Sequence, residues 1–195
     1  MVQAYTDKEL LDKVAILPSF QGYPEGRWIL GVRSNEDVPN KFDDKFYVFD
    51  KDKFVMVMSG TTNPGVTILR NYSSFNKDGA AILKADQWYY DIWHYGLHRN
   101  KVAGLLQRGG KVIVFRDGDK DNKSEEIGPE RPGWYGINFH PNTHNINATV
   151  TGDDINGWSA GCQVVNSINK YRDLMAWFKS NQKVVSYCLL NEFPA

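Results

Sequence analysis

Short stretches rich in β-branched and aromatic residues recur along most of the chain, separated by Gly, Asn and Asp residues. This pattern is typical of short strands joined by turns. The polar residues 50–53 lie between two such stretches and predict a hairpin. The predicted strands cover residues 28–32, 46–49, 54–58, 66–69, 102–106, 112–115 and 184–190.

Two segments have a helical pattern instead. Thr6 and Glu9 form a capping box that predicts a helix over residues 7–16, which Pro18 does not allow to continue. Ser167 is a candidate cap for a helix over residues 168–180. The apolar stripes of the two helices are Leu10, Leu11 and Val14 in the first, and Tyr171, Leu174, Met175 and Phe178 in the second.

These elements predict a mainly β fold, β-rich α+β, with an N-terminal helix and one C-terminal amphipathic helix. We expect residues 1–40 to form a helix and arm packed on the body, and residues 41–195 to form a single domain. The chain has 195 residues with 42% hydrophobic and 24% charged residues, which suits one globular domain with a substantial core.

The charge balance narrows the classes of partner. The chain has 23 basic and 23 acidic residues, so its formal net charge is zero, and no basic field favours nucleic acid.

No apolar run approaches the roughly 20 residues of a membrane-spanning helix. The first residues also lack the pattern of an export signal, so we expect the chain to be cytoplasmic as synthesised. We expect no cofactor.

The two cysteines have different contexts, and neither belongs to a CxxC pair. Cys188 lies in the apolar stretch 184–190 and is expected in the core. Cys162 follows Ser159 and Gly161 where an Asn/Gly-rich loop meets an apolar segment. That layout is typical of an exposed nucleophile whose neighbouring backbone N–H groups face a developing oxyanion.

A general base for this thiol is found upstream. Residues 135–140 predict a short strand that ends in His140, and Pro141 would end its pairing. A free thiol with a pKa near about 8.5 is mostly protonated at neutral pH, so a neighbouring imidazole that accepts its proton would activate it. The group that orients His140 is either a backbone carbonyl or one of Asp153 and Asp154.

At this point the sequence resembles a known family. Gly136-Ile137-x-x-His140, a loop, and Ser159-x-Gly161-Cys162 are similar to the motifs of the L,D-transpeptidase (YkuD-type) catalytic domain. The resemblance covers residues 136–165. It implies a β-rich fold, a cysteine nucleophile at Cys162, a base at His140, an oxyanion site shaped by Ser159 and Gly161, and peptidoglycan stem peptides as substrates.

The sequence departs from this family in three ways. Ala160 stands where the family has its motif histidine, Val164 stands where an Arg or Asn follows the cysteine by two, and the interval from His140 to Cys162 is longer. The family is normally exported, and this chain shows no leader. A phage lytic or virion protein that reaches the cell wall or periplasm through lysis would combine these features.

Further polar residues are candidates for contacts with substrate: His98, Arg116, Asp117, His144 and Trp158. His94 and His98 are four residues apart, as are His140 and His144, which leaves a metal hydrolase as an alternative. No HExxH motif accompanies them, so we expect no metal.

An acidic run follows one predicted strand. Asp117, Asp119 and Asp121 resemble the start of a calcium loop. Asn122 and Gly128 stand where such a loop needs Gly and Glu, so the run predicts a solvated acidic turn.

Two functions of different classes follow. The first is cysteine-dependent acyl transfer or hydrolysis on peptidoglycan stem peptides, by a transpeptidase, an L,D-peptidase or a phage lysin. The second, suggested by Ala160 and Val164, is a non-catalytic wall-binding or virion structural module on the same scaffold.

Overall fold

The computed structural model describes residues 1–194, which form eleven strands and three α-helices. The mainly β prediction is confirmed. The strands are β1 (Arg27–Arg33), β2 (Asp44–Asp50), β3 (Lys53–Thr61), β4 (Ala80–Leu83), β5 (Gln87–His98), β6 (Val102–Gln107), β7 (Val112–Asp117), β8 (Arg131–Gly133), β9 (Phe139–Pro141), β10 (Gln163–Val165) and β11 (Val184–Asn191). The helices are α1 (Asp7–Ala15), α2 (Val66–Asn71) and α3 (Ile168–Asn181), and a 3₁₀ turn, η1 (Tyr72–Ser74), follows α2.

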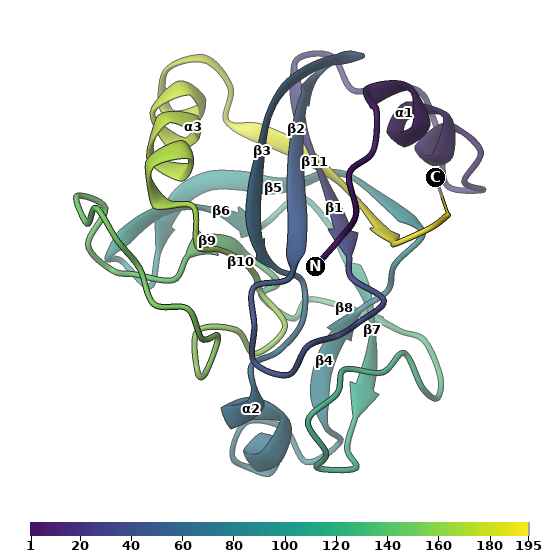
Figure 1. Cartoon of the computed structure of the whole chain (residues 1–195), viewed down its shortest axis with the longest axis vertical. Helices are drawn as coiled ribbons and strands as arrows, with labels where there is room; N and C mark the ends of the chain where they lie inside the picture. The colour runs from purple at the N-terminus through teal and green to yellow at the C-terminus, as the bar shows by residue number, and fades with distance from the viewer. Residues whose placement is uncertain (195) are drawn as a thin grey trace.

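Eight strands close into a barrel in the order β1-β11-β5-β6-β9-β10-β3-β2, and β4, β7 and β8 form a separate sheet. In Figure 1 this second sheet lies below the barrel, with α3 on the left and α1 on the right. Large side chains such as Phe46, Phe139 and Tyr187 fill the main core, and the buried face of α3 joins the same cluster. Closing the barrel leaves its strands without free edges.

The predicted N-terminal helix and its capping box are confirmed, because Thr6 Oγ1 accepts the Glu9 N–H and the Glu9 carboxylate accepts the Thr6 N–H. Leu10 and Val14 of α1 pack with Trp28 in a second cluster. β1 itself lies in the barrel between β2 and β11. The predicted arm over residues 1–40 is therefore too long, since only the part before β1 precedes the barrel.

Three local predictions are wrong. Residues 66–69 form α2 instead of a strand, because the Ile68 and Leu69 N–H groups bond back to the Gly65 carbonyl and both side chains are buried. The Ser167 hydroxyl accepts the Ser59 N–H and makes no cap for α3. The predicted strand over residues 135–140 begins only at Phe139, since Gly136 has a left-handed φ of 69° that interrupts an extended segment.

The second sheet supports the loop before β10. Arg33 of β1 connects the barrel to it, with Nη2 donating to the Leu83 carbonyl at 2.8 Å and Nε donating to Thr62 Oγ1 at 3.0 Å. Gly161 packs directly against Ala81 of β4. The position of Cys162 therefore depends on both sheets. Within residues 1–194, no helix has the length and apolar character needed to cross a membrane.

Candidate functional site

The site is built on two adjacent parallel strands, β9 and β10. Their register pairs Phe139 with Gln163 and His140 with Val164, and Cys162 directly precedes β10. Phe139 belongs to the core, and Gln163 Oε1 accepts the buried Tyr187 hydroxyl at 2.6 Å. Successive side chains on a strand point to opposite faces. His140 and Cys162 therefore lie on the same outer face of this strand pair.

The Cys162 thiol is partly exposed and protonated in this arrangement. Sγ donates a hydrogen bond to the Gly136 carbonyl at 3.4 Å. Burial raises the pKa of the thiol above its ordinary value, while the Asn138 backbone N–H and the charge of Arg99 oppose that rise. Because the thiol bonds to a backbone carbonyl, it is not ion-paired with His140 in the free protein.

His140 is buried and held in one tautomer by a backbone carbonyl. Its Nδ1 lies 2.9 Å from the Pro141 carbonyl oxygen, which only accepts hydrogen bonds, so Nδ1 carries the proton and Nε2 is left as the acceptor. The carbonyl is thus the orienting group, and Asp154 instead pairs with Lys41. Burial, followed by the neighbouring His98, lowers the pKa of His140 to about 3.

His98, at the end of β5, stacks on His140 with 4.0 Å between ring centroids and 14° between ring planes. The Asn138 side-chain amide lies 3.3 Å from His98 Nδ1 and donates to it, because the amide nitrogen is a donor only. Burial, with the charge of Arg99, lowers the pKa of His98 to about 4. Both rings of the stack are therefore neutral at neutral pH.

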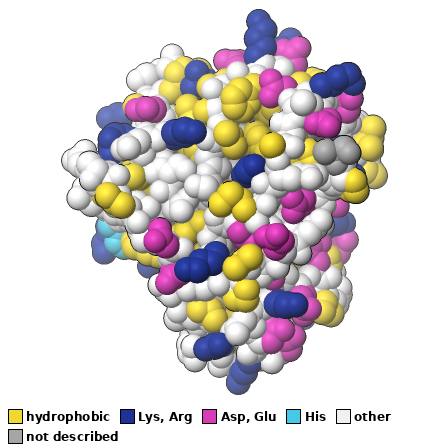
Figure 2. All heavy atoms as spheres, viewed as in Figure 1, with side chains coloured by type: hydrophobic (Ala, Val, Ile, Leu, Met, Phe, Trp, Pro, Cys, Tyr) yellow, Lys and Arg dark blue, Asp and Glu magenta, His cyan; other side chains and the backbone are white. Residues whose placement is uncertain are grey.

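These rings open onto a pocket of about 280 Å³. The pocket is lined by His98, Arg99, His140, His144, Gly157 and Trp158. The Trp158 ring packs edge-on against the His144 ring at 5.0 Å. On the face drawn in Figure 2, histidine colour appears only at the left edge of the molecule, next to basic side chains. The structure thus brings four of the predicted site residues together, His98, His140, His144 and Trp158.

The turn before Cys162 is held by Ser159, which is fully buried. Its Oγ accepts the Gly161 N–H at 3.2 Å and donates to the Cys162 carbonyl at 2.8 Å. The Gly161 N–H is therefore already bonded and does not face a substrate. The Cys162 N–H makes no hydrogen bond within residues 1–194, so it is the backbone donor left for an oxyanion.

Arg116 and Asp117 lie apart from this pocket. They line a separate cavity of about 190 Å³ at the end of β7, in the second sheet. The Arg116 guanidinium lies over the Tyr135 ring at 4.9 Å. Burial raises the pKa of Asp117 to about 6. The structure does not bring these two residues to the histidine pocket.

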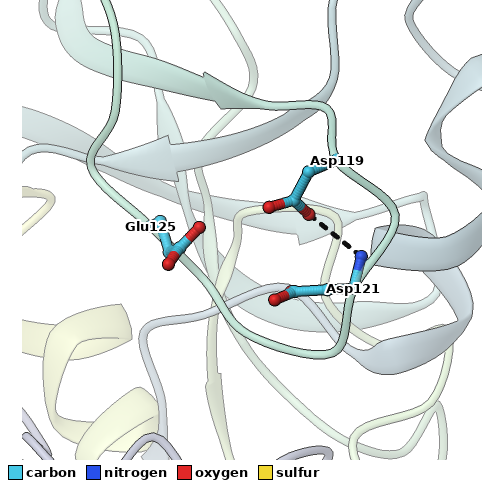
Figure 3. A group of neighbouring side chains, drawn as sticks. All are labelled: Asp119, Asp121 and Glu125. Carbon is cyan, nitrogen blue, oxygen red and sulfur yellow. Dashed lines mark hydrogen bonds between the residues drawn. The ribbon is translucent and has the colours of Figure 1, made fainter.

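The acidic run after β7 forms an irregular loop. The carboxylate oxygens of Asp119, Asp121 and Glu125 lie within 4.8 Å of one another, and Asp119 accepts the Asp121 N–H at 2.9 Å (Figure 3). Burial, then the charges of Asp119 and Asp121, raises the pKa of Glu125. Asp119 and Asp121 are exposed to solvent.

Within residues 1–194, this acidic group is the one set of three potential metal ligands that converges. No histidine belongs to such a set in the described residues, and His98 and His140 stack face to face.

Sequence reasoning missed Arg99 as a pocket residue. Its one sequence signal is its place directly after His98, because a side chain at the first position of a tight turn lies beside the end of its strand.

Comparisons with known proteins add no assignment: no family model, no curated protein and no solved structure matches the chain. The function is therefore argued from the chemistry of the site itself.

Proposed function

We propose that the protein catalyses cysteine-dependent acyl transfer or hydrolysis on peptides, with Cys162 as nucleophile and His140 as general base. The observation that supports this most is the common outer face of β9 and β10, on which both side chains lie. His140 also lines the pocket, whereas Cys162 is not among its lining residues. The imidazole also has the tautomer that a base requires, with Nε2 unprotonated.

In the proposed reaction, His140 Nε2 accepts the Cys162 proton and the sulfur attacks the peptide carbonyl carbon. The oxyanion is stabilised by the Cys162 N–H. The C–N bond then breaks, and the leaving amine takes the proton back from the imidazolium. A thioester remains. An amine or water attacks it next and gives its proton to His140, and the C–S bond breaks to release the thiol.

The electrostatics of the free protein favour a neutral thiol and a neutral imidazole. The pKa of Cys162 is raised and that of His140 is lowered, so the thiolate–imidazolium pair is disfavoured before substrate binds. Proton transfer would then accompany attack on the carbonyl. Full activation of the thiol for attack on a carbonyl would then depend on a bound substrate.

The proposed substrates are peptidoglycan stem peptides, on the resemblance of residues 136–165 to the L,D-transpeptidase motifs. The wall or periplasm is then the proposed site of action. Val164 is buried and packs with Phe42 and Ile155, so it offers no charge to a substrate. Any charged contact with the peptide must come from elsewhere in the pocket.

The test incubates the full chain with purified sacculi and follows muropeptide composition by chromatography. The wild type and Cys188→Ala should change the composition, whereas Cys162→Ala should not. Intact-mass measurement should detect a thioester on Cys162 in the wild type. Full activity of Cys162→Ala would end the proposal.

A second function, a non-catalytic wall-binding or virion module, is favoured by the Cys162 thiol bonding to the Gly136 carbonyl instead of to His140. It predicts that the chain sediments with sacculi and leaves muropeptide composition unchanged. The same experiment therefore separates the two functions.

A further inference from the structure

The histidine pocket contains one side chain with a permanent charge, Arg99. The other lining residues are three imidazoles, Gly157 and Trp158, and no carboxylate lines the pocket. His98 and His140 are neutral at neutral pH for the reasons given above. The pocket therefore carries a net positive charge, and Arg99 is the source of that charge.

A tight turn between β5 and β6 fixes the position of the Arg99 backbone. Arg99 and Asn100 both have left-handed φ values, 50° and 56°, and the Lys101 N–H donates to the His98 carbonyl at 3.0 Å. Three residues join β5 to β6, since His98 pairs with Val102, and the first two of them adopt positive φ. Such positions prefer Asn and Gly, so an Arg in the first position is conformationally unfavourable. The turn leaves the backbone of Arg99 directly beside the stacked histidine pair.

The Arg99 guanidinium makes no ion pair and no hydrogen bond with any group in residues 1–194. In contrast, the buried Arg33 binds Glu126, the Leu83 carbonyl and Thr62. The charge of Arg99 nevertheless acts on the whole site, since it lowers the pKa values of His98, His140, His144 and Cys162. Arg99 is thus an exposed cation whose electric field reaches the Cys162 thiol, and no anionic side chain in the described residues compensates its charge.

We propose that Arg99 binds a carboxylate of the substrate and so selects anionic ligands for attack by Cys162. This inference rests on the proposed function, because it assumes that Cys162 is the attacking group. A guanidinium pairs with a carboxylate through charge-assisted, two-point hydrogen bonds. A pocket of about 280 Å³ accommodates the end of a peptide that carries such a group. Arg99, in the turn between β5 and β6, would then supply the positive charge for the substrate that the apolar Val164 cannot supply.

The test compares two alkylating reagents of similar size on the full chain, iodoacetate, which is anionic, and iodoacetamide, which is neutral. Both react with the Cys162 thiolate, so any effect of Arg99 on the thiol pKa cancels in the ratio of their rate constants. Peptide mass spectrometry assigns the modification to Cys162. The variant is Arg99→Asn, since Asn accepts the left-handed turn conformation. The matched control is Arg108→Asn, which removes an exposed cation at the other end of β6.

We expect Arg99→Asn to lower the iodoacetate-to-iodoacetamide ratio by about tenfold, the size expected for loss of one charge-assisted hydrogen bond. Arg108→Asn should leave the ratio unchanged. An unchanged ratio in Arg99→Asn, or an equal fall in both variants, overturns the proposal for Arg99 while the role of Cys162 stands. If neither reagent modifies Cys162 in the folded wild type, both proposals are overturned, because the thiol is then not available for attack.

Discussion

The imidazole rings of His98 and His140 lie almost parallel, with 4.0 Å between their centroids. Two imidazolium ions at this separation would repel each other, and both rings are largely removed from water. Burial, with the charge of Arg99, lowers the pKa of His98 to about 4, and burial, followed by the neighbouring His98, lowers the pKa of His140 to about 3. Burial, with a smaller contribution from His98, thus keeps the proposed base unprotonated across the physiological pH range.

The stack predicts a specific dependence of stability on pH. The pKa of an unfolded histidine is about 6.5, above the folded values for His98 and His140, so the unfolded chain binds more protons between about pH 6.5 and pH 3. The free energy of unfolding should therefore fall as pH decreases through this window. Urea unfolding at several pH values measures it. His98→Asn should flatten the slope, and His94→Asn should not; equal slopes in all three proteins would contradict the prediction.

Replacing His140 should separate turnover from thiol reactivity. His140→Gln should lower acyl-transfer turnover by about 10²–10⁴-fold, the usual contribution of a general base. Alkylation of Cys162 by iodoacetamide should change little, because the thiol bonds to the Gly136 carbonyl and gains no ionisation from the imidazole in the free protein. A parallel loss of both activities would instead indicate a preformed ion pair. His94→Gln is the matched control.

The two cysteines should differ in accessibility. Cys188 is fully buried and its pKa is raised well above the ordinary value by that burial. Iodoacetamide should therefore modify Cys162 in the folded protein and Cys188 only after unfolding. Mass spectrometry with and without urea measures this. Modification of Cys188 in the native protein at the rate of Cys162 would contradict the burial of β11.

Most barrel strands could be predicted from sequence because each is a run of β-branched and aromatic residues that is long enough to be recognised as a strand. β10 could not, because it has only three residues and its pairing with β9 depends on contacts distant in sequence. β5 is the longest strand, and the sequence pattern does not predict it because its polar and aromatic residues do not alternate regularly. Residues 66–69 favour a strand by composition, and packing against Ala80 selects a helix.

The candidate site was predictable in part for similar reasons. Ser159, Gly161 and Cys162 are close in sequence, and their turn follows from local chemistry. The stacking of His98 on His140 and the entry of Arg99 into the pocket depend on the β5-β6-β9 order of strands. No local pattern contains that order. The bonding of the Gly161 N–H to Ser159 likewise does not follow from the sequence, because a Ser-x-Gly sequence is compatible with either a bonded or a free N–H.

Removal of the Ser159 hydroxyl should loosen the turn that carries the thiol. Ser159→Ala deprives the Gly161 N–H and the Cys162 carbonyl of their partner in a buried position. The free energy of unfolding should fall by about 1–3 kcal/mol, the usual effect of an unsatisfied buried polar group. Alkylation of Cys162 should also become less selective between iodoacetate and iodoacetamide. Ser124→Ala, whose side chain lies outside the site, is the control for stability.

Gly161 should be intolerant of any side chain. Its φ is 120°, a conformation rarely adopted by other residues, and a Cβ there would lie 2.6 Å from the Ala81 carbonyl oxygen of β4. Because that contact is with backbone, relief requires moving the second sheet or the Cys162 turn. Gly161→Ala should lower the free energy of unfolding by at least about 1–3 kcal/mol and reduce Cys162 alkylation.

The matched control for Gly161→Ala is Gly152→Ala, where a Cβ would meet no atom within 4 Å. Its free energy of unfolding should stay within about 0.5 kcal/mol of the wild-type value. Thermal and urea unfolding measure both variants. If Gly161→Ala were as stable as Gly152→Ala and equally reactive at Cys162, the packing of the Cys162 turn against β4 would not position the nucleophile. The second sheet would then have no part in the site.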